Sequence, residues 1–154
     1  MQPKLESTTI QASLELPCVQ PQMRFHHIGF VVKAIERSVA DFTVSLMADW
    51  DGTIVVDPLQ AVRVTFLHMR RMGMPSVELV EPLHARSPVS RFLAKGGGLH
   101  HLCYQVRSLD QQLEWRRANG EFIVQEPVPA VAFAQRRIAW VYTKQKLLLE
   151  LLEA

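Results

Sequence analysis

Hydrophobic and polar positions follow one order twice along the chain: a strand, an amphipathic helix and then further strands. In the first round, residues 24–32 are rich in β-branched and aromatic residues, as is typical of a strand. Residues 35–46 predict a helix, because hydrophobic residues recur every three or four positions and form one stripe along it: Ile35, Val39, Phe42 and Leu46. We expect three more strands at 52–56, 62–68 and 76–81.

The second round repeats this order. A strand is predicted at 99–106, and Ser108 with Gln111 forms a capping box before a helix at 109–118. The last strands are predicted at 121–125, 137–142 and 147–152, and a short helix at 88–94 links the two rounds. The pattern predicts a mixed α/β fold built of paired βαβββ modules with eight main strands.

These boundaries divide the chain into four parts. Residues 1–22 contain three prolines and no sustained periodicity, so we expect a flexible leader that the site does not need. The first module is predicted at 23–84, a linker at 85–98 and the second module at 99–154.

The two modules are in register with each other. His27 begins the segment HIGFVV, and His101 begins HLCYQV 74 positions later. Glu78 begins ELVE, and Glu150 begins ELLE 72 positions later. Each module therefore offers one histidine on its first strand and one glutamate on its last, and we interpret this repeated pair as the main functional signal.

The surroundings of these residues indicate a metal site. Glu150 lies in LLLELL, a strand that is apolar on both faces, where an unpaired carboxylate would cost several kcal/mol. A divalent metal bound by His27, Glu78, His101 and Glu150 would remove this cost. Two imidazoles and two carboxylates suit Zn, Co, Ni, Mn or Fe better than Mg or Ca, but they do not choose among them.

Strand alternation predicts which neighbours stay outside the site. Successive side chains point to opposite faces, so His26 and His100 are expected to face away from the ligands. Substitution of His100 should then have little effect on metal binding. Glu81 and Glu153 are expected to be surface charges at the strand ends.

Composition sets broader bounds. Hydrophobic residues make up 48% of the chain and charged residues 21%, and the net charge is +2, which gives no indication of nucleic-acid or membrane partners. Cys18 and Cys103 are the only cysteines, which favours a reduced, cytoplasmic setting over a disulfide framework.

Three segments carry a family resemblance. The sequences ELVEPL (78–83), SPV (87–89) and GGLHHLCY (97–104) resemble methylmalonyl-CoA epimerases within the vicinal oxygen chelate superfamily of glyoxalases, bleomycin-resistance proteins and dioxygenases. The resemblance implies an incomplete barrel-like cleft around a metal held by His27, Glu78, His101 and Glu150. It also implies a homodimer and a small-molecule substrate such as an acyl-CoA thioester.

The chemistry implied is proton abstraction beside a metal-chelated carbonyl, as an epimerase or isomerase performs it. Alternatives are a glyoxalase I-like lyase and a metal-retaining binding protein of the same fold without turnover. An extradiol dioxygenase needs two histidines, one carboxylate and more open positions, so four ligands argue against it.

The general base is the open question. Family epimerases carry a glutamate near a Pro-x-Gln segment, and here Leu59 or Arg63 stands where that acid is expected. Candidates for the base are therefore Glu150, Asp57 and His68. The family's glycine-rich turn is also replaced, by residues 129–137. Five arginines could hold coenzyme A phosphates or be ordinary surface residues: Arg63, Arg70, Arg71, Arg136 and Arg137.

Overall fold

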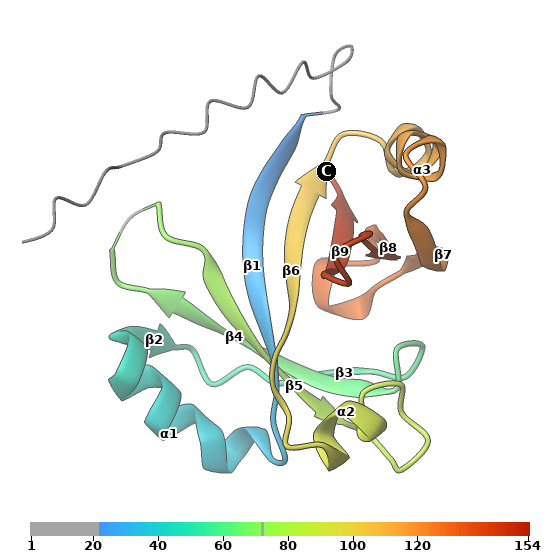
Figure 1. The fold of residues 1–154 in the computed structure, drawn as a ribbon. Coiled ribbons are helices and arrows are strands. Elements are labelled where there is room, and N and C mark those ends of the chain that lie inside the picture. Colours follow the sequence, from blue (N-terminus) through green and yellow to red (C-terminus); the bar gives the residue numbers. More distant parts are fainter. Residues whose placement is uncertain (1–21, 72) are drawn as a thin grey trace, which may run out of the picture.

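The computed structural model describes residues 22–71 and 73–154, so all but one residue of the predicted leader 1–22, with Cys18, lies outside the described part. The described residues form one mixed sheet of nine strands with three helices beside it (Figure 1). None of these helices is long and apolar enough to cross a membrane.

The elements follow the predicted order. The first half contains β1 (Met23–Val31), α1 (Ile35–Leu46), β2 (Ala48–Trp50), β3 (Val55–Asp57), β4 (Val62–Met69) and β5 (Ser76–Pro82). The short helix α2 (Ser90–Ala94) leads to the second half. That half contains β6 (Gly98–Val106), α3 (Leu109–Ala118), β7 (Phe122–Pro129), the 3-10 turn η1 (Val131–Phe133), β8 (Arg137–Tyr142) and β9 (Leu148–Glu153).

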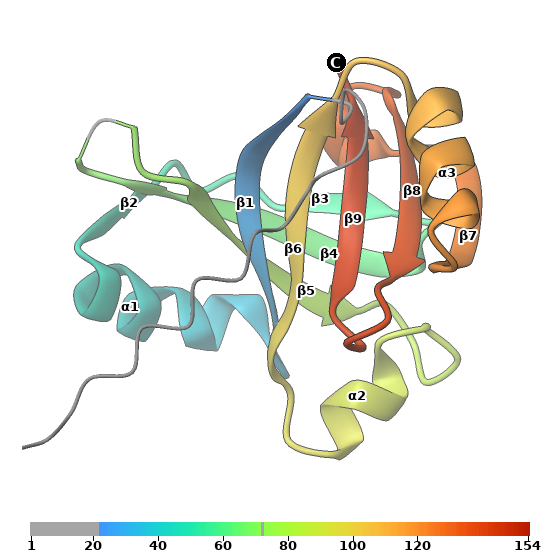
Figure 2. The same ribbon diagram turned by 45° about the horizontal axis from the view of Figure 1, so that its top comes forward.

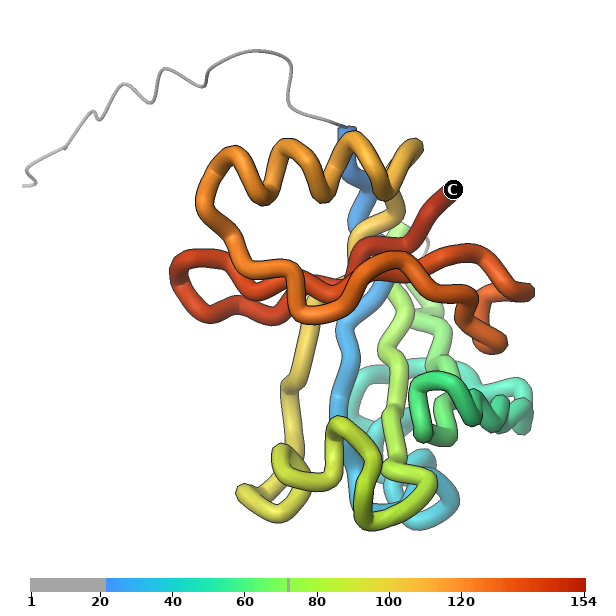
Figure 3. The backbone as a smooth tube through the Cα atoms, turned by 90° about the vertical axis from the view of Figure 1, so that its right-hand side faces the viewer, coloured from blue at the N-terminus to red at the C-terminus, as the bar shows by residue number. Residues whose placement is uncertain are grey.

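The sheet has approximate two-fold symmetry in its strand order, β2-β4-β5-β1-β6-β9-β8-β7. The first strands of the two halves, β1 and β6, are antiparallel neighbours at its centre. Each of them also pairs in parallel with the last strand of its own half, β5 or β9. Figures 2 and 3 show the second-half strands crossing over those of the first half, with α3 along their outer side. The predicted pair of modules is confirmed, and the sheet stays open.

One strand was not predicted. The sequence pattern placed a single strand at 52–56, whereas the structure has β2 and β3 on either side of a bend at Gly52. β2 has only three residues, two of them exposed, so it is too short to show an alternating pattern. The described residues therefore form nine strands, whereas the sequence predicted eight.

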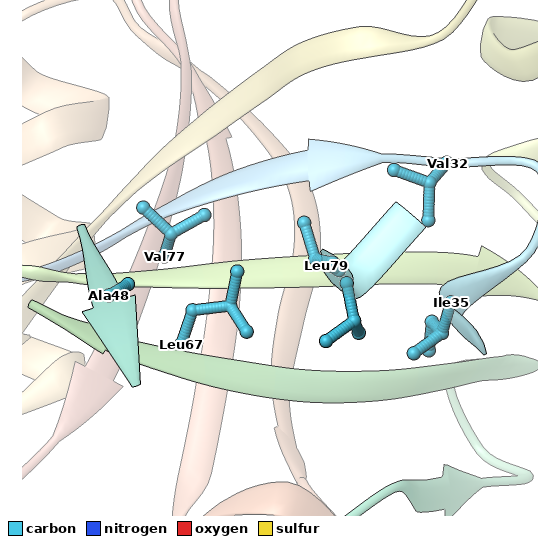
Figure 4. Close-up of a cluster of buried hydrophobic side chains, with 7 residues drawn as sticks. Val32, Ile35, Ala48, Leu67, Val77 and Leu79 are labelled. Atoms are coloured by element: carbon cyan, nitrogen blue, oxygen red, sulfur yellow. The ribbon is translucent and has the colours of Figure 1, made fainter. Parts of the chain in front are cut away.

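Each half buries one apolar face of its sheet under its helix. Below α1, Ile35 and Val39 pack with Leu67, Val77 and Leu79 (Figure 4). Below α3, an equivalent cluster contains Val106, Leu109, Leu113, Ala139, Val141 and Leu151. Because Leu79 and Leu151 face the helices, strand alternation turns Glu78 and Glu150 to the opposite, inner face of the sheet.

Glu81 and Glu153 have equivalent structural roles. Glu81 Oε2 accepts the N–H of Ile35, the first residue of α1, and Glu153 Oε1 accepts the N–H of Leu109, the first residue of α3. A carboxylate at a helix N-terminus satisfies a free N–H and stabilises the helix dipole. These glutamates therefore tie the last strand of each module to its helix.

Candidate metal centre

Four buried polar side chains meet on the inner face where the two halves of the sheet join. His27, Glu78, His101 and Glu150 come from β1, β5, β6 and β9, which are adjacent in the sheet. Each has at most 5% of its surface exposed. Their ligand atoms all lie within 4.8 Å of one another. The four residues that the sequence placed in one set thus converge in space.

Strand register and one glycine make this convergence possible. Gly29 on β1 lies opposite Glu78 on one side and His101 on the other. A Cβ atom added to Gly29 would lie 1.9 Å from Cε1 of His101, so a larger residue would displace the ring. On the other strand, Cys103 lies opposite His27 and Glu150. Each small residue therefore makes room beside the imidazole of the other module.

The spacing of the ligand atoms fits one small ion. Nε2 of His27 lies 3.2 Å from Nε2 of His101, 3.3 Å from Oε2 of Glu78 and 3.2 Å from Oε2 of Glu150. Nε2 of His101 lies 3.3 Å and 3.7 Å from the same two oxygens. Ligands about 2.0–2.1 Å from one tetrahedral metal ion would lie about 3.3–3.4 Å from each other.

A buried oxygen without a hydrogen bond supports the same fit. Oε2 of Glu150 is buried and, within the described part of the chain, accepts no hydrogen bond of normal geometry, although His27 Nε2 is near. A buried carboxylate oxygen without a hydrogen bond destabilises the folded protein unless a cation lies next to it. Two imidazole nitrogens and two carboxylate oxygens form a donor set for Zn, Co, Ni, Mn or Fe.

The charges of the site shift the pKa values of its members. Burial favours the neutral form of His27, but the negative charges of the adjoining carboxylates of Glu78 and Glu150 raise its pKa to about 10. Burial also opposes ionisation of Glu78, yet His27 and His101 hold the pKa of that carboxyl below its ordinary value. In the metal-free site His27 therefore carries a proton that a metal ion has to displace.

The strand pleat is interrupted before each ligand histidine. On β1, Phe25 and His27 lie opposite consecutive residues of β6, so His26 is an extra residue. On β6, His101 and Leu99 lie opposite consecutive residues of β1, so His100 is extra in the same way. Such β-bulges leave the extra residue unpaired and change its side-chain direction.

The expectation that His26 and His100 face away from the site is therefore wrong. Nδ1 of His26 lies 2.9 Å from Nδ1 of His27, and Nδ1 of His100 lies 3.0 Å from Nδ1 of His101. Strict alternation fails at these positions because each bulge adds one residue to one strand only. The sequence did contain one sign that His26 and His100 belong to the site: a pair of adjacent histidines occurs at equivalent positions in both modules.

A mostly apolar cavity opens beside the ligands. Val62 and Val64 of β4 line it, together with Phe133 of η1 and Trp140 of β8. The Phe133 ring stacks on His27 with the ring centres 5.8 Å apart, and Trp140 meets His101 edge to face at 4.7 Å. Among the described residues, no lysine or arginine lines this cavity.

Sequence reasoning did not identify these two aromatic residues. Trp140 lies opposite Glu150 on β9, which the pairing of the predicted strands 137–142 and 147–152 could have indicated. Phe133 comes from the segment that replaces the family's glycine-rich turn, and nothing in its sequence pattern predicted its position.

Asp57 lies at the cavity, but backbone groups surround its carboxylate. It is 2% exposed, and Oδ1 accepts the N–H groups of Leu59 and Gln60 at 3.0 Å. Oδ2 accepts the N–H of Val131 in η1 at 2.9 Å, so the residue links the two halves of the molecule. These bonds leave Asp57 poorly placed to accept a substrate proton.

His68, Leu59 and Arg63 all lie outside the cavity. Leu59 and Arg63 are the positions where the sequence suggested that the family acid is missing. His68 is exposed at the end of β4 and lies within hydrogen-bond distance of Ser76 Oγ, so the structure does not bring it to the ligands. Leu59 is 65% exposed. Arg63 pairs with Glu81 and Glu36 outside the cavity.

The other arginines are also outside the cavity lining. Arg70 pairs with Asp49, and Arg137 pairs with Glu153 and Asp110. Arg136 donates to the backbone carbonyls of Phe133 and Glu153, and Arg71 is exposed. Most of the predicted phosphate-binding set therefore has partners within the protein.

Cys103 is a free, buried thiol beside the ligands. Burial, together with the nearby charge of Glu150, raises its pKa, so it remains a neutral thiol and acts as a small packing residue.

Known proteins are similar to this chain in sequence and in fold. The sequence profile of the Glyoxalase/Bleomycin resistance protein/Dioxygenase superfamily matches residues 26–140. An ethylmalonyl-CoA/methylmalonyl-CoA epimerase from Cereibacter sphaeroides is 25% identical over 123 residues, which cover 79% of this chain and 89% of that protein. The mitochondrial methylmalonyl-CoA epimerase of Homo sapiens is 30% identical over 89 residues, which cover 56% of this chain and 48% of that protein.

The fold also matches a solved structure. Methylmalonyl-CoA epimerase from Mycobacterium tuberculosis superimposes with a TM-score of 0.73 at 24% identity, covering 84% of this chain and 86% of that one. At this identity the superposition establishes the common fold alone.

Proposed function

The chain belongs to the glyoxalase/bleomycin resistance protein/dioxygenase superfamily, and on this basis we propose that it is a divalent-metal-dependent epimerase or isomerase similar to methylmalonyl-CoA epimerase. The reaction proposed is removal of the proton beside a carbonyl of an acyl-CoA thioester. The observation that carries the proposal is the buried set of two histidines and two glutamates at the cavity. Such a set has no evident structural purpose without a cation.

His27, Glu78, His101 and Glu150 would hold the metal ion. When bound, the ion would polarise a substrate carbonyl and stabilise the negative charge that forms as the adjacent proton leaves. The two glutamates balance the charge of a divalent ion, so the occupied site would be neutral inside an apolar cavity. Phe133 and Trp140 pack on the histidine rings and would keep water away from them.

Glu150 is our preferred general base. Its Oε2 accepts no normal hydrogen bond in the described structure, whereas the oxygens of Asp57 are occupied by backbone N–H groups. His68 is outside the cavity. Proton transfer to Oε2 of Glu150 would require this oxygen to leave the metal ion, which would free a base next to the bound substrate.

Epimerisation also requires return of a proton to the opposite face of the same carbon. Glu78 and Glu150 lie on β5 and β9, which flank β1 and β6 on opposite sides in the strand order. We propose Glu78 as the partner that returns the proton; it would first take up a proton from solvent, and Glu150 would release the abstracted proton to solvent at the end of the turnover. This pairing uses the symmetry of the two modules.

One observation keeps two alternatives in consideration. The β4 side chains at the cavity are the apolar Val62 and Val64, so this strand supplies no acid there. A glyoxalase I-like lyase that uses a ligand glutamate as its base would tolerate this arrangement. A metal-retaining binding protein without turnover would tolerate it as well.

The test begins with metal analysis of the purified protein after loading with Zn, Co, Ni, Mn or Fe. Exchange of the C2 proton of methylmalonyl-CoA in deuterated buffer is then followed by mass spectrometry. Metal-dependent exchange that is lost in Glu150→Gln, at a metal concentration that still saturates the variant, supports the proposal. Absence of bound metal in the wild type would overturn it.

A parallel assay separates the alternatives. The hemithioacetal of glutathione and methylglyoxal is offered to the same metal-loaded protein. Turnover of this substrate without exchange of methylmalonyl-CoA identifies a lyase, and metal binding without either reaction identifies a binding protein.

We also propose a homodimer, as the family resemblance implies, and a cytoplasmic setting, as the two cysteines favour. Sedimentation velocity would measure the mass in solution, and a monomer at micromolar concentration would contradict the first part.

A further inference from the structure

We propose that His26 and His100 are positioning residues that orient the metal ligands His27 and His101 through two equivalent β-bulges. Each would accept a hydrogen bond from Nδ1–H of the ligand histidine that follows it. The inference rests on the proposed metal centre and adds a role for two residues outside the ligand set.

The two histidine pairs have nearly the same geometry. The Nδ1–Nδ1 distances are 2.9 Å for His26 and His27 and 3.0 Å for His100 and His101. The ring planes meet at 77° and 87°, with the centres 5.2 Å and 5.3 Å apart. Adjacent residues of a regular strand point to opposite faces, so this contact depends on the bulge in each pair.

The direction of the hydrogen bond follows from the role of the ligand. Nε2 of His27 and Nε2 of His101 face each other and the two glutamates. A histidine that binds a metal through Nε2 carries its proton on Nδ1 and needs an acceptor there. The nearest acceptor is in both cases Nδ1 of the preceding histidine, which must be neutral to accept.

Packing fixes both acceptor rings. His26 contacts Phe133 with the ring centres 5.6 Å apart, and His100 contacts Phe92 at 4.8 Å.

A neutral acceptor has a specific consequence for charge. Metal-bound histidines commonly donate to a carboxylate, which adds a negative charge next to the ligand. Here the two ligand glutamates already balance a divalent ion, and imidazole acceptors orient the rings without making the buried site anionic. Loss of such an outer partner typically weakens metal binding by about 10- to 100-fold.

The test uses substitutions that separate hydrogen bonding from packing. His100→Asn retains an acceptor close to the position of Nδ1, whereas His100→Phe retains the ring but has no acceptor. Zinc affinity is measured by competition with a chromogenic chelator, and the visible spectrum of the cobalt-loaded protein reports ligand geometry. His26→Asn and His26→Phe are measured in the same way, with His68→Phe as the control.

We expect His100→Phe and His26→Phe to bind zinc about 10- to 100-fold more weakly and to change the cobalt spectrum. The Asn variants should remain close to the wild type. A packing role predicts the reverse order, because Phe fills the space better than Asn. Equal affinities in all variants, or greater loss in the Asn variants, would overturn the inference.

Failure of the inference is distinguishable from failure of the proposed function. Wild-type protein that binds no zinc or cobalt overturns both. Wild-type binding with unaffected Phe variants overturns the positioning role alone. Thermal unfolding of each metal-free variant shows whether its fold is intact.

Discussion

At the scale of single residues, the site brings together two buried carboxylates that repel each other unless positive charge lies between them. Two glutamates and two histidines lie within contact distance in a region sheltered from water. In the metal-free protein a proton on His27 partly compensates the carboxylates, as its raised pKa indicates. Metal binding would replace this proton with a larger charge shared by all four side chains.

Removal of one ligand should therefore weaken metal binding strongly. Structural zinc sites bind with about 10–16 kcal/mol, so loss of one of four ligands is expected to cost about 2.5–4 kcal/mol, or roughly 60- to 700-fold in affinity. We expect this result for His101→Ala, measured by chelator competition. His68→Ala, an exposed histidine outside the site, is the control, and equal effects of both variants would contradict the assignment.

Metal binding should also depend on pH through His27. Its pKa of about 10 in the folded, metal-free protein means that the ring is protonated at pH 7, and a metal can bind only the deprotonated ring. Apparent affinity should thus rise about tenfold per pH unit from pH 7 to 9 and level off near the pKa. Calorimetry in buffers of different ionisation enthalpy should detect about one proton released per metal.

The sign of the shift gives a second, independent readout. The raised pKa of His27 stabilises the metal-free fold. This stabilisation is complete below pH 6.5, the pKa of the ring in the unfolded chain, and is lost as the pH rises through about 10. Glu78→Gln removes a charge that raises this pKa, so the variant should release less than one proton. Metal affinity that is constant between pH 7 and 9 would contradict this account.

Single residues were predictable where a repeat marked them. The four candidate ligand positions follow from the register of the two modules and from a glutamate inside an apolar strand. Asp57 could not be judged in the same way, because its three backbone partners depend on how a loop and a turn from different halves meet.

At the scale of elements, the strands determine which side chains reach the cavity. Alternation along β4 brings Val62 and Val64 to the cavity and leaves Arg63 paired outside it. The loop before β4 exposes Leu59 to solvent. The two positions where the sequence suggested that an acid had been lost, Leu59 and Arg63, thus do not line the cavity.

This arrangement predicts where a base can be introduced. Val64→Glu should place a carboxylate at the cavity and increase C2 exchange of methylmalonyl-CoA, since general base catalysis contributes about 10²–10⁴-fold. Val64→Gln, which has similar size but no base, is the matched control. Thermal unfolding shows whether the buried substitution is tolerated.

Leu59→Glu and Arg63→Glu provide the comparison. Both side chains lie away from the cavity, so neither variant should change the exchange rate. Faster exchange in Leu59→Glu than in Val64→Glu would show that the loop, and not β4, approaches the substrate.

Helices were easier to predict than the details of strands. The stripe of α1 and the Ser108 cap of α3 depend on neighbours in sequence, and the structure has both, with Ser108 Oγ accepting the N–H of Gln111. The bulges at His26 and His100 depend on pairing between β1 and β6, which lie far apart in sequence. Alternation within one strand cannot reveal a residue that its partner strand lacks.

At the scale of the whole molecule, the site depends on the contact between two modules. Each half supplies one histidine and one glutamate, so neither half alone has a complete ligand set. The proposed division into modules at 23–84 and 99–154 then predicts that residues 1–22 are not needed. A chain starting at Gln22 should bind zinc within about twofold of the full chain, and loss of metal would contradict this division.

Asp57 joins the two halves of the molecule at a place away from the four candidate ligands. Its carboxylate accepts two N–H groups from its own loop and one from Val131 across the cleft. Asp57→Ala would leave these buried donors without an acceptor, at a cost of at least about 2 kcal/mol or about 4–8 °C in Tm. Metal affinity should change little, since all four ligands lie on other strands.

Asp57→Asn distinguishes this structural role from catalysis. The amide keeps one oxygen acceptor, so stability should be intermediate between that of the wild type and Asp57→Ala. If Glu150 is the base, proton exchange in the stable, metal-loaded Asn variant should remain near the wild-type rate. An Asn variant with normal Tm and normal metal content but about 10²–10⁴-fold slower exchange would instead identify Asp57 as the base. Measurement of all three quantities on one preparation separates a carboxylate that joins the two modules from one that takes the substrate proton.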